Sequence, residues 1–342
     1  MTAPDVEVAV VGGGVMGLAT ARSLAQAGRD VAVLEQFELG HDRGSSHGSS
    51  RIFRLSYPDA EWVALAQEAL PLWRELEAEC EEVLLELHGS IDVGEWKANR
   101  DALASCGAAF EVLDRTEAER RFELRLESGE QALFQAEGGV ALADRALRAL
   151  ESSARAHGAR LRELARVAAV RETGDLVEVE LDGETVRART VVVSAGAWAP
   201  RLVELDARPT LETTAYFACD RPIPSLVDGT IQGQVLGYAL AAPGVGAKAG
   251  LHKSGSRVDP DEPGEPDEAM ALAAGEWLAR RLPAVSPEPV RIETCLYTNL
   301  ADDRFTLERR GRVVVGSPCS GHGFKFAPLI GRRLAELATE PL

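Results

Sequence analysis

The sequence predicts an α/β fold in which two domains are interleaved along the chain. Three observations support this prediction. An apolar strand near the N-terminus runs into a glycine-rich turn and an amphipathic helix, a glycine-rich segment near the C-terminus precedes another helix, and helical and strand-like stretches alternate between them. The 342 residues, 45% of them apolar, are enough for two domains with sizeable cores.

Composition excludes several classes of function. The net charge of −17, from 54 acidic and 37 basic residues, opposes a phosphate backbone or an anionic membrane, so we expect neither nucleic acid nor a membrane as partner. The five cysteines include no CxxC pair, which supports neither a disulfide framework nor a metal site. The N-terminus shows no signal peptide or membrane span, and we expect a cytoplasmic protein.

The first element is a Rossmann-type nucleotide-binding turn. Residues 6–11 form an apolar strand that continues into the sequence GGGVMG and a helix to about residue 27. In this GxGxxG pattern Gly12 makes the tight turn, Gly14 lets the backbone approach a pyrophosphate, and Gly17 permits close helix packing. The helix N-terminus adds N–H groups and a positive dipole. The sequence therefore predicts a dinucleotide site here.

The second strand, residues 30–34, ends at Glu35. A carboxylate at this strand end is placed to accept hydrogen bonds from the ribose of an adenosine, and it disfavours a 2′-phosphate. FAD and NAD both bind to this fold, so the nucleotide end leaves both cofactors open.

The next segment, RGSSHGSSRIFR at residues 43–54, has no place in a typical NAD domain. Together with the GxGxxG turn, the KAGLH run at 248–252, the CLY run at 295–297 and the GHGFK run at 321–325, it resembles the monomeric sarcosine oxidase and N-methyltryptophan oxidase family. These are FAD-dependent amine oxidoreductases of the D-amino acid oxidase superfamily. The resemblance implies FAD, an amino acid substrate, oxygen as the electron acceptor and a monomeric protein.

The resemblance and the alternation of elements divide the chain into five segments. The expected FAD-binding domain comprises residues 1–80, 143–208 and 296–342. The expected substrate domain is α+β, is built on a mostly antiparallel sheet, and comprises residues 81–142 and 209–295. The elements behind this division are helices at 61–79, 144–157 and 327–337, strands at 167–170, 190–193 and 313–315, and a hairpin turn at 182–183. The acidic, proline-rich residues 258–267 are expected to form a solvated loop.

Flavin-dependent amine oxidation requires an anchor for the substrate carboxylate and a cation that helps oxygen to accept electrons. The resemblance assigns the carboxylate to Arg54 and Lys325, and the activation of oxygen to Lys248. Guanidinium geometry suits a bidentate clamp, and lysine is rare in this chain, which has only four. Arg51 is placed beside the flavin. His252 shares a strand face with the lysine four residues before it and is expected to line the same pocket.

Two cysteines compete for a covalent bond to the flavin. The resemblance assigns this thioether to Cys295, and the reaction requires a thiolate and hence an electropositive neighbourhood. From the residues alone, Cys319 is an equal candidate because it lies two residues before Gly321. Tyr238 and Tyr297 are expected to form walls of the substrate pocket.

The other expected cofactor contacts lie in the nucleotide turn and in the loops that approach the flavin. They are Val15, Met16, Gln36, Ser45, Ser46, Ser50, Val167, Ala195, Gly196, Trp198, Gly321, His322, Gly323 and Lys325. No metal is expected.

The sequence therefore predicts FAD-dependent oxidation of a secondary amino acid, N-methyl or cyclic, at its C–N bond, with an imine and hydrogen peroxide as products. An oxidase or dehydrogenase for a bulkier amine, such as N-methyltryptophan, pipecolate or a glycated amino acid, is the alternative within enzymes. A non-catalytic flavin-binding protein is the alternative outside them. The joint presence of Lys248, His252, Arg54 and Lys325 argues against a protein without catalysis.

Overall fold

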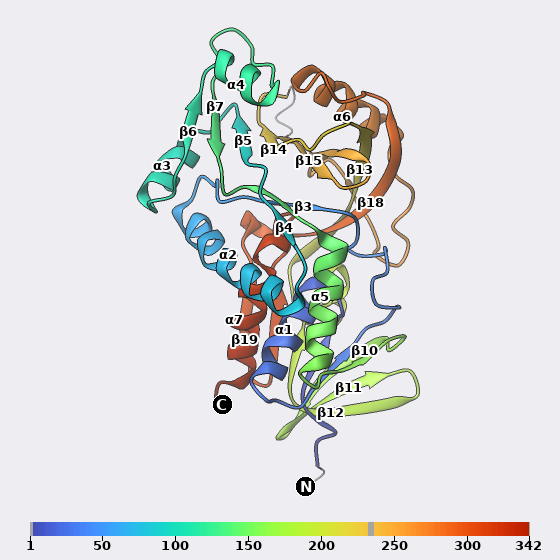
Figure 1. The fold of residues 1–342 in the computed structure, drawn as a ribbon. Helices are drawn as coiled ribbons and strands as arrows, with labels where there is room; N and C mark the ends of the chain where they lie inside the picture. The colour runs from blue at the N-terminus through green and yellow to red at the C-terminus, as the bar shows by residue number, and fades with distance from the viewer. Residues whose placement is uncertain (1–2, 232–235, 342) are drawn as a thin grey trace.

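The computed structural model describes residues 3–231 and 236–341. Its two large sheets, of eight and nine strands, lie at opposite ends of the molecule, and a three-stranded sheet lies between them (Figure 1). Both chain termini lie at the end formed by the eight-stranded sheet (Figure 1). No described helix has the length and hydropathy that a membrane span requires.

The eight-stranded sheet has a parallel centre in the order β9-β2-β1-β12-β20, with β19 antiparallel to β20 and the β10-β11 hairpin on the first half of β12. Its strands are β1 (Val6–Val11), β2 (Val31–Leu34), β9 (Arg160–Arg162), β10 (Val167–Thr173), β11 (Leu176–Leu181), β12 (Glu184–Val193), β19 (Thr306–Arg310) and β20 (Val313–Ser317). Valines fill the centre because strands buried on both faces are apolar throughout. The parallel centre places the carboxyl ends of β1, β2 and β20 at one edge.

The nine-stranded sheet has one parallel pair, β5-β14, and antiparallel pairs elsewhere. Its strands are β5 (Ser90–Val93), β6 (Glu111–Leu113), β7 (Ala132–Gln135), β13 (Ala207–Ala218), β14 (Ser225–Asp228), β15 (Leu236–Ala242), β16 (Gly246–His252), β17 (Ser256–Arg257) and β18 (Pro289–Leu300). The third sheet consists of three short strands, β3 (Arg51–Phe53), β4 (Leu85–Glu86) and β8 (Gly139–Ala141).

The register of the nine-stranded sheet collects polar residues on one face. Because neighbours in register share a face, each row across the sheet points to one side. One row consists of Asp92, Val227, Tyr238, Gly250, Thr214 and Glu293. The next row consists of Leu240, Lys248, Tyr216 and Arg291. The opposite face is apolar and packs on α6 (Glu268–Arg281).

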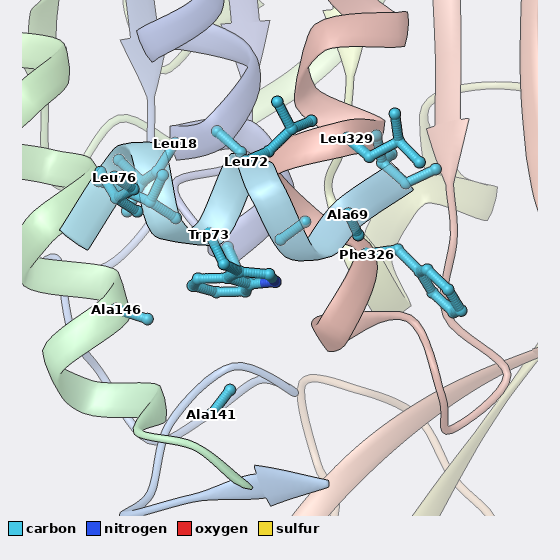
Figure 2. Packing of buried hydrophobic residues seen from close by; sticks show 14 of the residues in the cluster. Leu18, Ala69, Leu72, Trp73, Leu76, Ala141, Ala146, Phe326 and Leu329 are labelled. Atoms are coloured by element: carbon cyan, nitrogen blue, oxygen red, sulfur yellow. The ribbon is translucent and has the colours of Figure 1, made fainter. Parts of the chain in front are cut away.

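The helices α1 (Val15–Gln26), α2 (Ala60–Cys80), α5 (Ala143–Ala156) and α7 (Ala327–Thr339) pack against one another beside the eight-stranded sheet. Trp73 of α2 is fully buried in this cluster, near Leu76 and Ala146 (Figure 2). Its indole Nε1 donates a hydrogen bond of 2.7 Å to the carbonyl oxygen of Lys325. The core of the helical layer thus fixes the backbone of a predicted site residue.

The predicted fold class is confirmed, and most element positions agree with the sequence pattern. Two differences have physical reasons. Residues 81–142 also contain α3 (Lys97–Ser105) and α4 (Arg115–Phe122), which are too short to give a clear period. The loop at 258–267 is largely exposed, as predicted, but it also has contacts that the sequence did not predict: Asp261 accepts a hydrogen bond of 2.7 Å from the indole of Trp198 and pairs with Arg166. The limits of the five domain segments stay a prediction.

Candidate active site

A cavity of about 510 Å³ extends from the glycine turn of β1 to the polar face of the nine-stranded sheet. It is lined by all of the predicted site residues except Gly17. A side chain at Gly17 would place its Cβ 1.8 Å from the carbonyl oxygen of Gly12, so this glycine serves the close packing of turn and helix. The fold therefore brings together residues from both ends of the chain around one space.

The carboxylate of Glu35 lies at the nucleotide end of the cavity. Its Oε2 accepts a hydrogen bond of 2.6 Å from the backbone of Gly13, and its Oε1 accepts one of 3.0 Å from the backbone of Phe37. Burial raises the pKa of Glu35, but the hydrogen bonds from His41 and from these two backbone groups outweigh burial, and the net pKa is lowered. An ionised acceptor is thus fixed at the end of β2.

Several hydroxyl groups along the cavity are available to a polar ligand. The Oγ atoms of Ser194 and Ser317 are buried and have no hydrogen-bond partner among the described residues, and both serines line the cavity. Buried polar groups without partners are rare and call for an explanation. Ser46 has another role, because its Oγ accepts a hydrogen bond of 3.1 Å from the backbone of Val15 and ties the 43–54 loop to α1.

The side chain of Arg51 holds the 43–54 loop in place by hydrogen bonds to its backbone. Its Nη2 donates to the carbonyl oxygens of Ser45, at 2.8 Å, and His47, at 2.6 Å, and its Nη1 donates to that of Ser50, at 2.9 Å. The same Nη2 lies 3.8 Å from Sγ of Cys295. The guanidinium therefore connects the loop to β18 and places a positive charge beside the thiol.

Both candidate thiols line the cavity, in different settings. Cys295 is buried, and burial raises the pKa of its thiol even though Arg51 and Lys248 act in the opposite direction. Cys319 is half-buried, and its Sγ accepts a hydrogen bond of 3.2 Å from the backbone of Thr298. The cations beside Cys295 are the electropositive neighbourhood that thiolate chemistry requires.

Two cations meet at Tyr57 at the far end of the cavity. The Arg54 guanidinium lies over the Tyr57 ring, 4.9 Å from its centroid, and its Nη1 donates to Oδ1 of Asp92 at 2.5 Å. Lys325 Nζ donates to the Tyr57 hydroxyl at 2.7 Å and to the carbonyl oxygen of His322 at 2.8 Å. Burial, with Arg54 nearby, lowers the pKa of Lys325 well below its ordinary value. A negatively charged carboxylate bound here would favour the charged form of Lys325 and would stabilise both cations.

Lys248 and His252 project from β16 into the same cavity, as their spacing predicts. Burial, with Arg51 nearby, lowers the pKa of Lys248 to about 7, and no described residue accepts a hydrogen bond from its ammonium group. Burial lowers the pKa of His252 to about 4, so its ring is neutral at pH 7. The His252 ring lies 5.5 Å from that of Tyr297, and burial raises the pKa values of Tyr297 and Tyr238, which keep their protons.

Residues 7–337 match the family described as FAD dependent oxidoreductase. The chain belongs to this family. Human peroxisomal sarcosine oxidase is 32% identical over 96% of this chain and 91% of its own length. Monomeric sarcosine oxidase of Bacillus sp. (strain NS-129) is 28% identical over 97% and 92%. The solved structure of NikD, "an unusual amino acid oxidase essential for nikkomycin biosynthesis", is 31% identical with a TM-score of 0.90, covering 99% of this chain and 95% of that one.

The residues present fit FAD, the cofactor of the FAD dependent oxidoreductase family. The glycine turn leaves space for a pyrophosphate, and Glu35 offers an ionised acceptor for a ribose. The unpartnered hydroxyls of Ser194 and Ser317 offer polar contacts in the part of the cavity between the glycine turn and β18. Cys295 and Lys248 line the opposite end, where the reactive ring would lie. The predicted enzyme class and cofactor are confirmed.

Sequence reasoning missed three residues of the site. Tyr57 contacts both cations that are predicted to bind the carboxylate, and Asp92 holds Arg54. Tyr216, fully buried, lies beside Lys248. Of these three, only Asp92 could have been noticed in the sequence, because a lone aspartate within an apolar strand is unusual at a buried position.

Proposed function

We propose that this FAD-dependent enzyme is an oxidase for a small secondary amino acid, with oxygen as the electron acceptor. The substrate loses two electrons and a proton from the carbon next to nitrogen and a second proton from the nitrogen, and the imine formed hydrolyses in water. Bound FAD supplies the acceptor for this oxidation and returns two electrons, with two protons, to oxygen as hydrogen peroxide. The names of the relatives, sarcosine oxidase and amino acid oxidase, support this proposal.

One observation carries the proposal: two buried lysines and the half-buried Arg54 face one cavity in two separate places. Arg54 and Lys325 stand together at Tyr57, where a carboxylate would complete their hydrogen bonds. Lys248 stands apart on β16, beside Arg51 and Cys295. A protein that only stored flavin would have no use for a carboxylate site, since the buried ammonium of Lys325, which has no carboxylate partner among the described residues, costs stability.

The residues around the substrate then have separate tasks. Arg54 and Lys325 bind the carboxylate and so orient the carbon that is oxidised. His252 is neutral at pH 7 and does not repel a substrate amine. Tyr238 and Tyr297, both protonated, wall the pocket and exclude water. Lys248 stabilises the negative charge that develops on oxygen as it is reduced.

Lys248→Met tests this assignment. The substitution removes the ammonium group but keeps an apolar chain of similar length. We expect flavin reduction by N-methylglycine without oxygen to change less than tenfold, and reoxidation by oxygen to slow by about 100-fold or more. Stopped-flow absorbance measures both steps. Lys97→Met is the control, because that lysine is exposed and does not line the cavity. Equal slowing of both steps in Lys248→Met contradicts the role in oxygen activation.

We also propose that FAD is covalently attached through Cys295. The two adjacent cations support this assignment over Cys319, whose sulfur already accepts a backbone hydrogen bond. After acid denaturation and filtration, the wild-type polypeptide should stay yellow, Cys295→Ser should release its colour, and Cys319→Ser should keep it. Colour retained by Cys295→Ser would contradict the assignment. A monomeric state and a cytoplasmic location are further parts of this proposal; two relatives are named peroxisomal.

A substrate panel distinguishes a small substrate from a bulkier one. Sarcosine, pipecolate, N-methyltryptophan and a glycated amino acid share the carboxylate and the secondary amine but differ in size. Because FAD would fill much of the 510 Å³ cavity, we expect kcat/KM to be largest for the smaller two. Selective turnover of N-methyltryptophan would favour the alternative.

A further inference from the structure

Three side chains beside Lys248 take no part in the mechanism above. Tyr216 on β13 lies directly opposite Lys248 of β16 on one side and Arg291 of β18 on the other, and Glu293 lies one row away on the same face. Tyr216 is fully buried, whereas the side chains of Arg291 and Glu293 are 48% and 23% exposed. A line of polar groups thus runs from the buried ammonium towards solvent.

Contacts join these groups into a unit. The Tyr216 hydroxyl donates to Oε2 of Glu293 at 2.8 Å, and Nε of Arg291 lies 3.1 Å from Oε1 of the same carboxylate. The Arg291 guanidinium lies 3.8 Å from the centroid of the Tyr216 ring. The Lys248 ammonium lies 5.1 Å from that centroid. One aromatic ring therefore contacts two cations, and its hydroxyl holds the carboxylate.

The other groups around Lys248 leave its charge with little support. Arg51, from the 43–54 loop, repels it. His47, from the same loop, is neutral at pH 7 because burial lowers its pKa to about 4. On β18 burial raises the pKa of the Cys295 thiol, and on β15 the hydroxyl of Tyr238 keeps its proton. On β18 the Glu293 carboxylate raises the pKa of Lys248, against the effects of burial, Arg51 and Arg291.

We propose that Glu293, held by Tyr216 and opposed by Arg291, sets the charge of Lys248 and so the pH range in which oxygen is reduced efficiently. The three are positioning residues, because they act through Lys248. The proposal rests on the oxygen-activating role proposed for that lysine. Its physical basis is Coulombic: in a partly buried site a carboxylate favours the ammonium form and a guanidinium disfavours it.

The chain makes a direct test practical, because it contains only four lysines. NMR of the FAD-loaded protein labelled with ¹³C-lysine follows the titration of each side chain, and Lys248→Met identifies the signal. In Glu293→Gln we expect the Lys248 midpoint to fall by about half a pH unit, and in Arg291→Gln to rise by a similar amount. Tyr216→Phe keeps the ring but releases Glu293, so its midpoint should fall by less than in Glu293→Gln.

The opposite signs of the two shifts are the decisive feature. A merely structural role for these residues would move both midpoints the same way or not at all, and either result would overturn the proposal. Glu293 and Arg291 are partly exposed, so both variants are expected to fold. As a second readout, the pH profile of reoxidation should move with the NMR midpoint, while anaerobic reduction stays unchanged. If Lys248→Met fails to slow reoxidation, the oxygen-activating role proposed for Lys248 fails, but the NMR shifts still test the charge control separately.

Discussion

The two ends of the cavity recognise their ligands by different physical means. At the nucleotide end the contacts are backbone N–H groups, neutral serine hydroxyls and one carboxylate, Glu35, whose lowered pKa keeps it ionised. At the proposed catalytic end the candidate residues are buried side chains, and burial has moved the pKa values of Lys248 and Lys325 well away from their ordinary range. The first end depends on the shape of the backbone and the second on charge.

This difference predicts which changes should disrupt each end of the cavity. An added Cβ should disrupt the nucleotide end at every pH, because a steric overlap does not titrate. The catalytic end should respond, in addition, to pH and to the loss of single charges. The predictions below test this contrast, from the largest expected effect to the smallest.

Gly17→Ala should abolish flavin binding. Its Cβ would lie 1.8 Å from the carbonyl oxygen of Gly12, and the turn must deform to relieve the overlap. We expect purified protein with no visible flavin absorbance, or insoluble protein. Gly28→Ala is the matched control, because its Cβ would meet nothing within 4 Å. It strains the backbone, with φ at 73°, but should retain flavin. A yellow Gly17→Ala protein would contradict the account of the turn.

Arg54→Gln should raise KM for the amino acid by about 10- to 100-fold, since a charge-assisted bidentate contact to a carboxylate contributes roughly 1.5–3 kcal/mol. The flavin content should not change, because this residue lies at the substrate end. Steady-state kinetics with peroxide detection measure the effect. Arg43→Gln, an exposed arginine of the same loop, serves as control. A fall in kcat with unchanged KM would indicate that Arg54 does not bind the carboxylate.

Carboxylate binding should weaken as pH rises through the lowered pKa of Lys325. Below that pKa the ammonium is charged and attracts the ligand; above it the amine is neutral and the attraction is lost. Acetate, which has no amine to titrate, is the probe, and perturbation of the flavin spectrum gives its Kd. We expect a decline in affinity of about tenfold with rising pH. Lys325→Met should bind acetate weakly at every pH; an unchanged pH dependence in that variant would assign it to another group.

The smallest effect is expected at the loop that supports Trp198. Hydrogen bonds from Trp198 and Arg201 lower the pKa of Asp261 to about 2. Because the folded-state pKa is below the ordinary value, the stabilisation is present above pH 3.8 and is lost as pH falls through about 2. Asp261→Asn should therefore lower Tm at pH 7 by about 1–3 °C, with a smaller difference near pH 3. Glu262→Gln is the control. A Tm difference between wild type and Asp261→Asn that does not change with pH would contradict an electrostatic origin of the stabilisation.

The contrast also explains what the sequence could predict. The strand, glycine turn, helix and Glu35 are local, so spacing alone predicted their structure. The convergence of Arg54 and Lys325 came only from family resemblance, because 270 intervening residues hide their proximity. The register of three strands places Tyr216 opposite Lys248 and Glu293 one row away, and single-sequence patterns do not determine register. Asp92 likewise gains its role only from the partner that the fold places beside it.

The most direct test of the account is the flavin spectrum during one anaerobic cycle. The purified yellow protein is mixed with N-methylglycine without oxygen, and air is then admitted while peroxide is measured. We predict that the substrate bleaches the flavin, that oxygen restores the colour within seconds, and that one hydrogen peroxide forms per flavin reoxidised. Bleaching without rapid recovery in air would indicate a dehydrogenase. A flavin that neither this substrate nor pipecolate bleaches would contradict oxidation of small secondary amino acids.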